Sequence, residues 1–185
     1  MAACISSRRK FGVKSAPGEH NGRERSFSTN LGREAKTTVK VFRAFPRESL
    51  DVKPHERSRS IRDLAWQCVI DERVIEQIID GASDLRNVPP SPQAPESMEE
   101  IAAAYETAHR EASEKMRLPK TEFSKTVSVT MRGGSIQLEQ AETLWGNLLD
   151  QVHHRGQLTI YLRQAGGKVP SIYGPSGDEA LSFPS

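Results

Sequence analysis

LWGNLLDQVHHRGQLTIYLRQAGGKVPSIY, residues Leu144 to Tyr173, is the stretch that decides the fold. Apolar residues recur in it with helical spacing, which predicts a long helix with one broad apolar face. The glycine pair at 166 and 167 is typical of a helix end. The predicted apolar face consists of Leu144, Trp145, Leu148, Leu149 and Val152.

Asp150 and His154 lie four residues apart in this helix, so their side chains share one face. The adjacent His153 points elsewhere, because neighbouring helix residues diverge by about 100°. Two interpretations stay open for the pair. It is either a hydrogen bond on the helix surface or two ligands of a divalent metal, for which carboxylate and imidazole are suitable. A metal site of this kind needs a third ligand from another helix.

Three runs of sequence resemble the DinB/YfiT-like family of damage-inducible proteins. They are HHRGQLTIYLR (His153 to Arg163), KVPSIYGPSGDE (Lys168 to Glu179) and FPRESLDVKPHERSRSIRDLAW (Phe45 to Trp66). The resemblance covers roughly Leu31 to Glu179. It implies an all-α fold, a DinB-like four-helix bundle with a long crossover between helices 3 and 4. It also implies a homodimer and a metal site between the second and fourth helices.

The resemblance implies a histidine ligand in an LAWH-type motif of the second helix. This chain has Leu64-Ala65-Trp66-Gln67 there, and an amide oxygen is a weaker ligand than imidazole for zinc, nickel or iron. The implied ligands are therefore His154, Asp150 and Gln67, with Glu72 as a supplement one turn along. A divalent zinc, nickel, iron or manganese ion is expected to bind weakly or not at all.

Three further side chains have alternative roles in the sequence. Glu72 falls within the apolar stripe of the predicted helix from Ile61 to Asp80, so it must be coordinated or paired there unless it lies at the margin and pairs with an arginine. Arg155 either binds an anionic substrate or pairs with a carboxylate. Tyr161 continues the strip of Asp150 and His154, which makes it a candidate substrate contact.

The remaining chain predicts two more helices and one extended segment. Apolar spacing indicates helices from Leu31, with Asn30 as N-cap, to Phe45 and from Ser97 to Met116. The proline-rich run NVPPSPQAP, residues 87–95, predicts a loop. Alternating residues from Glu122 to Met131 predict an extended segment, after which a Gly-Gly turn leads into the fourth helix at about Ser135.

Charge divides the chain into a tail and a domain. The first thirty residues hold six of the 26 Lys/Arg and two of the 24 Asp/Glu, so the rest is slightly acidic. We expect a disordered basic tail at 1–30, a folded domain at 31–179 and a short tail at 180–185. An acidic domain without a basic stripe argues against nucleic-acid binding.

The composition suits one domain in the cytoplasm. No apolar run approaches the roughly 18 residues that a membrane span needs, so no membrane partner is expected. Cys4 and Cys68 are far apart in the 185-residue chain, and reduced thiols are expected rather than a disulfide.

Two functions remain open. The first is a metal-dependent hydrolase or small-thiol S-transferase, in which an ion at Asp150 and His154 activates water or a thiol of a small-molecule substrate. The second is a non-catalytic, dimeric, stress-linked binding protein with a degenerate metal site, which the glutamine at 67 favours. Whether the purified protein carries a metal distinguishes the two.

Overall fold

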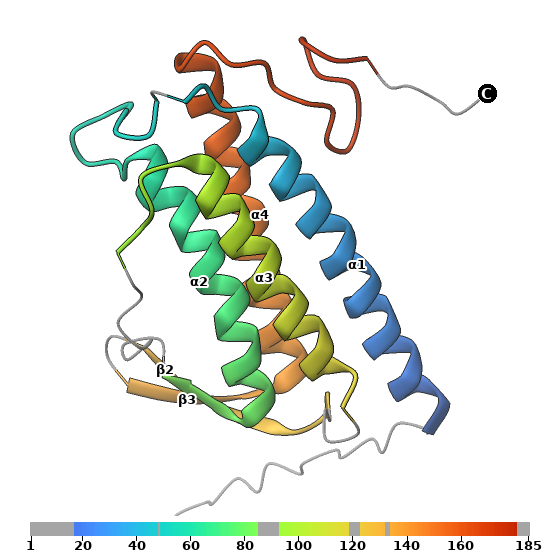
Figure 1. The fold of residues 1–185 in the computed structure, drawn as a ribbon. Helices are drawn as coiled ribbons and strands as arrows, with labels where there is room; N and C mark the ends of the chain where they lie inside the picture. The colour runs from blue at the N-terminus through green and yellow to red at the C-terminus, as the bar shows by residue number, and fades with distance from the viewer. Residues whose placement is uncertain (1–16, 48, 85–92, 119–122, 132–133, 181–185) are drawn as a thin grey trace, which may run out of the picture.

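The structure, a computed structural model, describes residues 17–47, 49–84, 93–118, 123–131 and 134–180. This part of the chain forms a four-helix bundle with a small sheet at one end (Figure 1). The four-helix bundle that the sequence predicts is confirmed. The helices are α1 (Pro17–Arg43), α2 (Ile61–Asp80), α3 (Met98–Met116) and α4 (Gln140–Gln164).

The first helix begins earlier than predicted. It starts at Pro17, so the predicted boundary at residue 30 falls inside it and Asn30 is not an N-cap. The reason is Phe27, which lies one turn before Leu31 on the same face and is fully buried. Its ring packs edge-on against those of Phe123 and Trp145. The basic segment at residues 1–16 lies outside the described residues.

A serine side chain caps the start of α2 and another caps the start of α3. The Ser60 hydroxyl accepts a hydrogen bond from the backbone N–H of Asp63 (3.1 Å), and Ser97 accepts one from the N–H of Glu100 (3.2 Å). Helix α2 ends at Gly81, whose φ of 83° is the left-handed conformation that favours glycine. Residues 87–92 of the predicted proline-rich loop lie outside the described residues.

A three-stranded sheet closes one end of the bundle. It consists of β1 (Ala82–Asp84), β2 (Thr126–Met131) and β3 (Gly134–Glu139), with β1 parallel to β2 and β3 antiparallel to it. The predicted extended segment is β2. The prediction that Ser135 opens the fourth helix is wrong, because alternation continues through Ile136 and Leu138 as a second hairpin strand. The sequence analysis missed β1 entirely.

The start of α4 is tied to the end of α2. The Gln140 amide is fully buried and donates to the carbonyl oxygens of Ile78 (2.8 Å) and Ile79 (3.2 Å). The carbonyls of a helix end lack partners within the helix; here Ile79 accepts from Gln140, and Ile78 accepts from both Gln140 and the backbone N–H of Gly81. The bonds from Gln140 also fix the position of α4 along α2, which matters for side chains that meet farther along the two helices.

Helices α2 and α3 run in the same direction, and α4 runs against them (Figure 1). The first halves of α2 and α3 share a core cluster with the second half of α4, and the second halves of α2 and α3 share another cluster with the first half of α4. The link that returns along the bundle therefore joins α2 to α3. The predicted crossover between α3 and α4 is corrected, because those two helices are antiparallel and their link contains the hairpin.

Within the described residues, no helix is long and apolar enough to cross a membrane. Cys68 is a free, buried thiol on α2, packed in the core cluster of the first half of that helix.

Candidate metal centre

Asp150 and His154 meet on α4 as their spacing predicts. The Nε2 atom of His154 lies 3.3 Å from Oδ2 of Asp150. The His154 side chain is 14% exposed and that of Asp150 is 57% exposed, so the pair spans the edge of the seam between α4 and α2. His153 is exposed and lies near Gln157, with its ring centroid 5.7 Å from that of His154.

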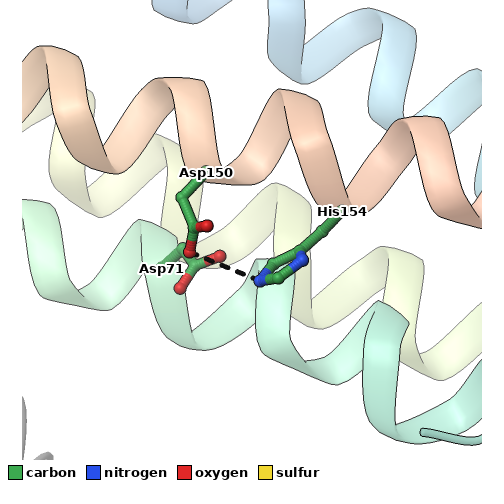
Figure 2. A group of neighbouring side chains, drawn as sticks. All are labelled: Asp71, Asp150 and His154. Atoms are coloured by element: carbon green, nitrogen blue, oxygen red, sulfur yellow. Dashed lines mark ion pairs between the residues drawn. The ribbon is translucent and has the colours of Figure 1, made fainter. Parts of the chain in front are cut away.

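A third acidic side chain, Asp71 of α2, points at this pair (Figure 2). One potential ligand atom from each of Asp71, Asp150 and His154 lies within 4.8 Å of the other two. Asp71 is 4% exposed, so it forms the floor of the group, while Asp150 forms its open side. The sequence analysis missed Asp71, although it lies one helical turn beyond Gln67 on the same face.

Gln67 supports Asp71 instead of taking its place. The Gln67 amide donates to Oδ1 of Asp71 (2.8 Å), and its own oxygen accepts a hydrogen bond from the guanidinium of Arg59 (3.0 Å). The amide oxygen that was expected to ligate a metal is therefore already engaged. The group that could hold a metal therefore contains Asp71, with Gln67 beside it as a hydrogen-bond donor.

A second contact holds Asp71 from α4. The Asn147 side-chain amide donates to the backbone carbonyl of Asp71 (2.9 Å). Asn147 lies one turn before Gln151 and close in sequence to Asp150, so this bond fixes the height of α4 against α2 at the level of the three candidate ligands. Supporting bonds of this kind are what orient metal ligands in proteins.

Burial shifts the protonation of two of the three groups. Desolvation raises the pKa of Asp71 to about 7, although the hydrogen bond from Gln67 opposes the shift. Desolvation also lowers the pKa of His154 and outweighs the opposing effect of Asp150. At neutral pH the imidazole is therefore neutral, the form that can bind a metal.

The donor set and its unsatisfied atoms fit a divalent cation. Oδ2 of Asp71 and Nδ1 of His154 are buried and have no hydrogen-bond partner among the described residues. Buried polar atoms without partners are rare in proteins, and a bound cation is one way to satisfy the Asp71 oxygen. The His154 nitrogen that faces the two carboxylates is Nε2 (Figure 2). Two carboxylates and one imidazole suit zinc, iron, nickel or manganese. Three protein ligands also leave a position open, as in catalytic metal sites.

Glu72 does not join this group, although the sequence suggested it as a supplementary ligand. It is fully buried about 100° around α2 from Asp71, where it accepts a hydrogen bond from the Tyr105 hydroxyl (2.9 Å). Its other oxygen lies 3.4 Å from Nδ1 of His109, and the Tyr105 hydroxyl also contacts Gln151 (3.0 Å). The alternative of a marginal Glu72 paired with an arginine is also wrong.

Arg155 lies in the core between α4 and α1. It is 2% exposed and forms an ion pair with Glu34 (2.7 Å), while its guanidinium stacks over the ring of Tyr173. The structure thus places it against a carboxylate, which was the second of its predicted roles. Tyr161 is half-buried and packs on the core of the bundle.

Comparison with known proteins finds a matching family and a relative of similar sequence. The profile of the DinB family matches residues 21–180. The uncharacterised protein YrdA of Bacillus subtilis strain 168 is 29% identical over 152 residues, which cover 81% of this chain and 87% of that protein.

Two solved structures share the fold. A DinB-like protein from Bacillus cereus ATCC 10987 has a TM-score of 0.65 and 23% identity, covering 80% of this chain and 95% of its own. A DinB-like protein from Bacillus subtilis has a TM-score of 0.61 and 15% identity, covering 76% and 92%.

Proposed function

The chain belongs to the DinB family, and from this premise we propose that it is a metal-dependent enzyme of hydrolase or small-thiol S-transferase type. The observation that carries the proposal is the convergence of Asp71, Asp150 and His154 from two helices. The buried Oδ2 atom of Asp71, which has no hydrogen-bond partner among the described residues, supports the same conclusion.

Each side chain contributes a distinct property to the proposed centre. His154 is neutral at physiological pH and offers a lone pair, and Asp71 binds a cation when it loses its proton near pH 7. Asp150, the most exposed of the three, leaves the centre accessible from solvent. A bound zinc, nickel, iron or manganese ion would lower the pKa of a coordinated water or thiol towards neutrality.

The surrounding residues keep this arrangement in place without contacting the reacting atoms. Gln67 holds one carboxylate oxygen of Asp71, which leaves the other available to a cation. The Asn147 bond holds the backbone at the same residue. The proposal thus assigns positioning roles to Gln67 and Asn147 and a ligand role to the three side chains they surround.

The second candidate is a non-catalytic binding protein with a degenerate site. The observation that favours it is that the group is partly satisfied by itself, since Asp150 pairs with His154 and Asp71 accepts from Gln67. Such a protein would keep the bundle and retain no metal. The homodimer and the cytoplasmic location expected from the sequence stay predictions under either function.

Elemental analysis of the purified protein tests the proposal. The native protein is equilibrated with zinc, nickel, iron and manganese in turn, and loose ions are removed by gel filtration. We expect close to one ion per chain, and loss of that ion in Asp71→Asn, Asp150→Asn and His154→Ala. The matched controls His153→Ala and Asp63→Asn should retain it, because both residues are exposed on the same two helices. A native protein that retains no ion contradicts the enzyme proposal and supports the second candidate.

A further inference from the structure

Arg59 lies beside the candidate metal centre on a fixed stretch of backbone. It immediately precedes Ser60, the N-cap of α2, which is itself buried. The link before α2 is also tied to the helix start, since the backbone N–H groups of Ile61 and Arg62 donate to the carbonyls of Val52 (3.1 Å) and Leu50 (2.9 Å). Arg59 is exposed, so its side chain is accessible from solvent.

A chain of hydrogen bonds connects the Arg59 guanidinium to Asp71. One guanidinium nitrogen donates to Gln67, and Gln67 donates to Asp71. A guanidinium has five N–H donors in a planar fork, and the bond to Gln67 uses only one nitrogen. Arg59 is also close enough for its charge to act on both Asp71 and His154. The side chain is thus oriented at the centre and keeps donors for another acceptor.

The charges around the centre add up to a preference for an anion. A divalent cation with two carboxylates and a neutral imidazole has no net charge, and Arg59 adds one positive charge. Three protein ligands leave a position open for a substrate atom. A substrate that fills this position and also carries one negative charge would be neutralised by Arg59.

We propose that Arg59 determines substrate specificity by binding the carboxylate of a small monoanionic substrate whose reacting atom occupies the open metal position. The inference rests on the proposed metal centre and deepens it. Arginine suits the role because its planar fork matches the two oxygens of a carboxylate. Lysine at the same place would supply the charge without the fork.

Two thiols that differ in one group test this inference. Mercaptoacetate carries a carboxylate and 2-mercaptoethanol a hydroxyl in its place, and both bind cobalt through sulfur. The cobalt-loaded protein is titrated with each thiol, and the thiolate-to-cobalt absorption band gives the Kd. The variants are Arg59→Gln, Arg59→Lys and the control Arg57→Gln, an exposed arginine of the same link. Comparing the ratio of the two Kd values between variants cancels intrinsic differences between the thiols.

We expect the ratio to favour mercaptoacetate about tenfold more in the native protein than in Arg59→Gln, a difference typical of one charge-assisted contact. Arg59→Lys should recover part of the preference, and Arg57→Gln should keep all of it. An unchanged ratio in Arg59→Gln, or no binding of either thiol to a cobalt-loaded protein, overturns the role of Arg59 and leaves the metal centre intact. A native protein that holds no cobalt overturns the metal centre itself.

Discussion

Two polar clusters begin at adjacent residues of α2 and of α4, and they differ in how the buried carboxylate of α2 is satisfied. The open cluster contains Asp71, Asp150 and His154, and the closed cluster contains Glu72, Tyr105, His109 and Gln151. In the open cluster, an oxygen of Asp71 and a nitrogen of His154 have no partner within the part of the chain that the structure describes. In the closed cluster, both oxygens of Glu72 have a partner, and the one atom without a partner among the described residues is the amide nitrogen of Gln151, not a carboxylate oxygen.

The difference shows how one step along a helix changes the role of a carboxylate. Asp71 and Glu72 are both buried, but a rotation of about 100° turns Asp71 towards α4 and the solvent edge and Glu72 towards α3. The hydroxyl of Tyr105 supplies the donor that a buried carboxylate requires. The second oxygen of Asp71 lacks such a donor among the described residues, so Asp71 is the carboxylate available to a cation.

Breaking the closed cluster should have the largest effect on stability. Glu72→Ala removes the acceptor of Tyr105 and His109 and leaves a cavity in the core. We expect a loss of about 3–4 kcal/mol in the free energy of unfolding, measured by urea denaturation at pH 7. Glu72→Gln keeps an acceptor for Tyr105 and serves as the control with a smaller loss. A loss below about 1 kcal/mol for Glu72→Ala would show that the cluster is not structural.

Neutralising Asp71 in the open cluster should change the free energy of unfolding in the opposite direction and stabilise the metal-free protein. The pKa of Asp71 is raised in the folded state, so its proton is bound more tightly there than in the unfolded chain. The resulting cost to stability is small near pH 4, grows as pH rises towards 7 and is largest above that value. In the presence of a chelator, Asp71→Asn should therefore stabilise the metal-free protein by roughly 2–4 kcal/mol at pH 8.

Urea denaturation of native protein and Asp71→Asn at pH 5 and pH 8 measures this effect. The gain should be larger at pH 8, because the native carboxylate is ionised there and largely protonated at pH 5. Asn can still accept the bond from Gln67, so that contact is preserved. An equal gain at both pH values, or a loss at pH 8, would contradict the raised pKa.

Removing the support of Asp71 should have a smaller effect, confined to the open cluster. Gln67→Ala deletes the amide that holds Oδ1 of Asp71. We expect metal affinity to fall about tenfold, as is usual for loss of a bond that orients a ligand, with little change in urea stability. Competition with a chromogenic chelator gives the affinity. Full retention of native affinity would mean that Gln67 does not position Asp71.

The smallest expected loss of stability comes from a substitution that affects the closed cluster and leaves the open cluster unchanged. Tyr105→Phe removes the hydroxyl shared by Glu72 and Gln151 and should cost about 1–2 kcal/mol in unfolding free energy. Because Tyr105 does not contact the open cluster, metal affinity should be unchanged. A parallel loss of metal binding would show that the clusters act as one unit.

Much of this arrangement could be predicted from the sequence where the signal is local. The spacing of Asp150 and His154 predicted their contact, and Ser97 predicted the start of a helix correctly. The start of α1 was missed because polar residues and glycine surround Phe27, although the same helical period reaches it. The strand β3 was missed because a Gly-Gly turn marks the end of one segment and does not specify whether a strand or a helix comes next.

Of the candidate site, Asp150 and His154 were predicted from the sequence, and Asp71 was not. Asp71 lies four residues after Gln67 and therefore on the same face of the helix. The resemblance placed the expected histidine ligand at position 67, so Gln67 was chosen instead. Glu72 was correctly recognised as a carboxylate in need of a partner. Its partners, Tyr105 and His109, lie on another helix, and the packing of one helix against another cannot be read from the period of either. The crossover was misplaced for the same reason.

The central claim is that Asp71, and not its neighbour Glu72, faces the ion. Cobalt absorption spectra of the native protein, Asp71→Asn and Glu72→Gln test it directly, because d–d bands report the ligands of bound cobalt. We predict that Glu72→Gln keeps the native bands and that Asp71→Asn loses or shifts them. Native bands in Asp71→Asn together with altered bands in Glu72→Gln would contradict the account.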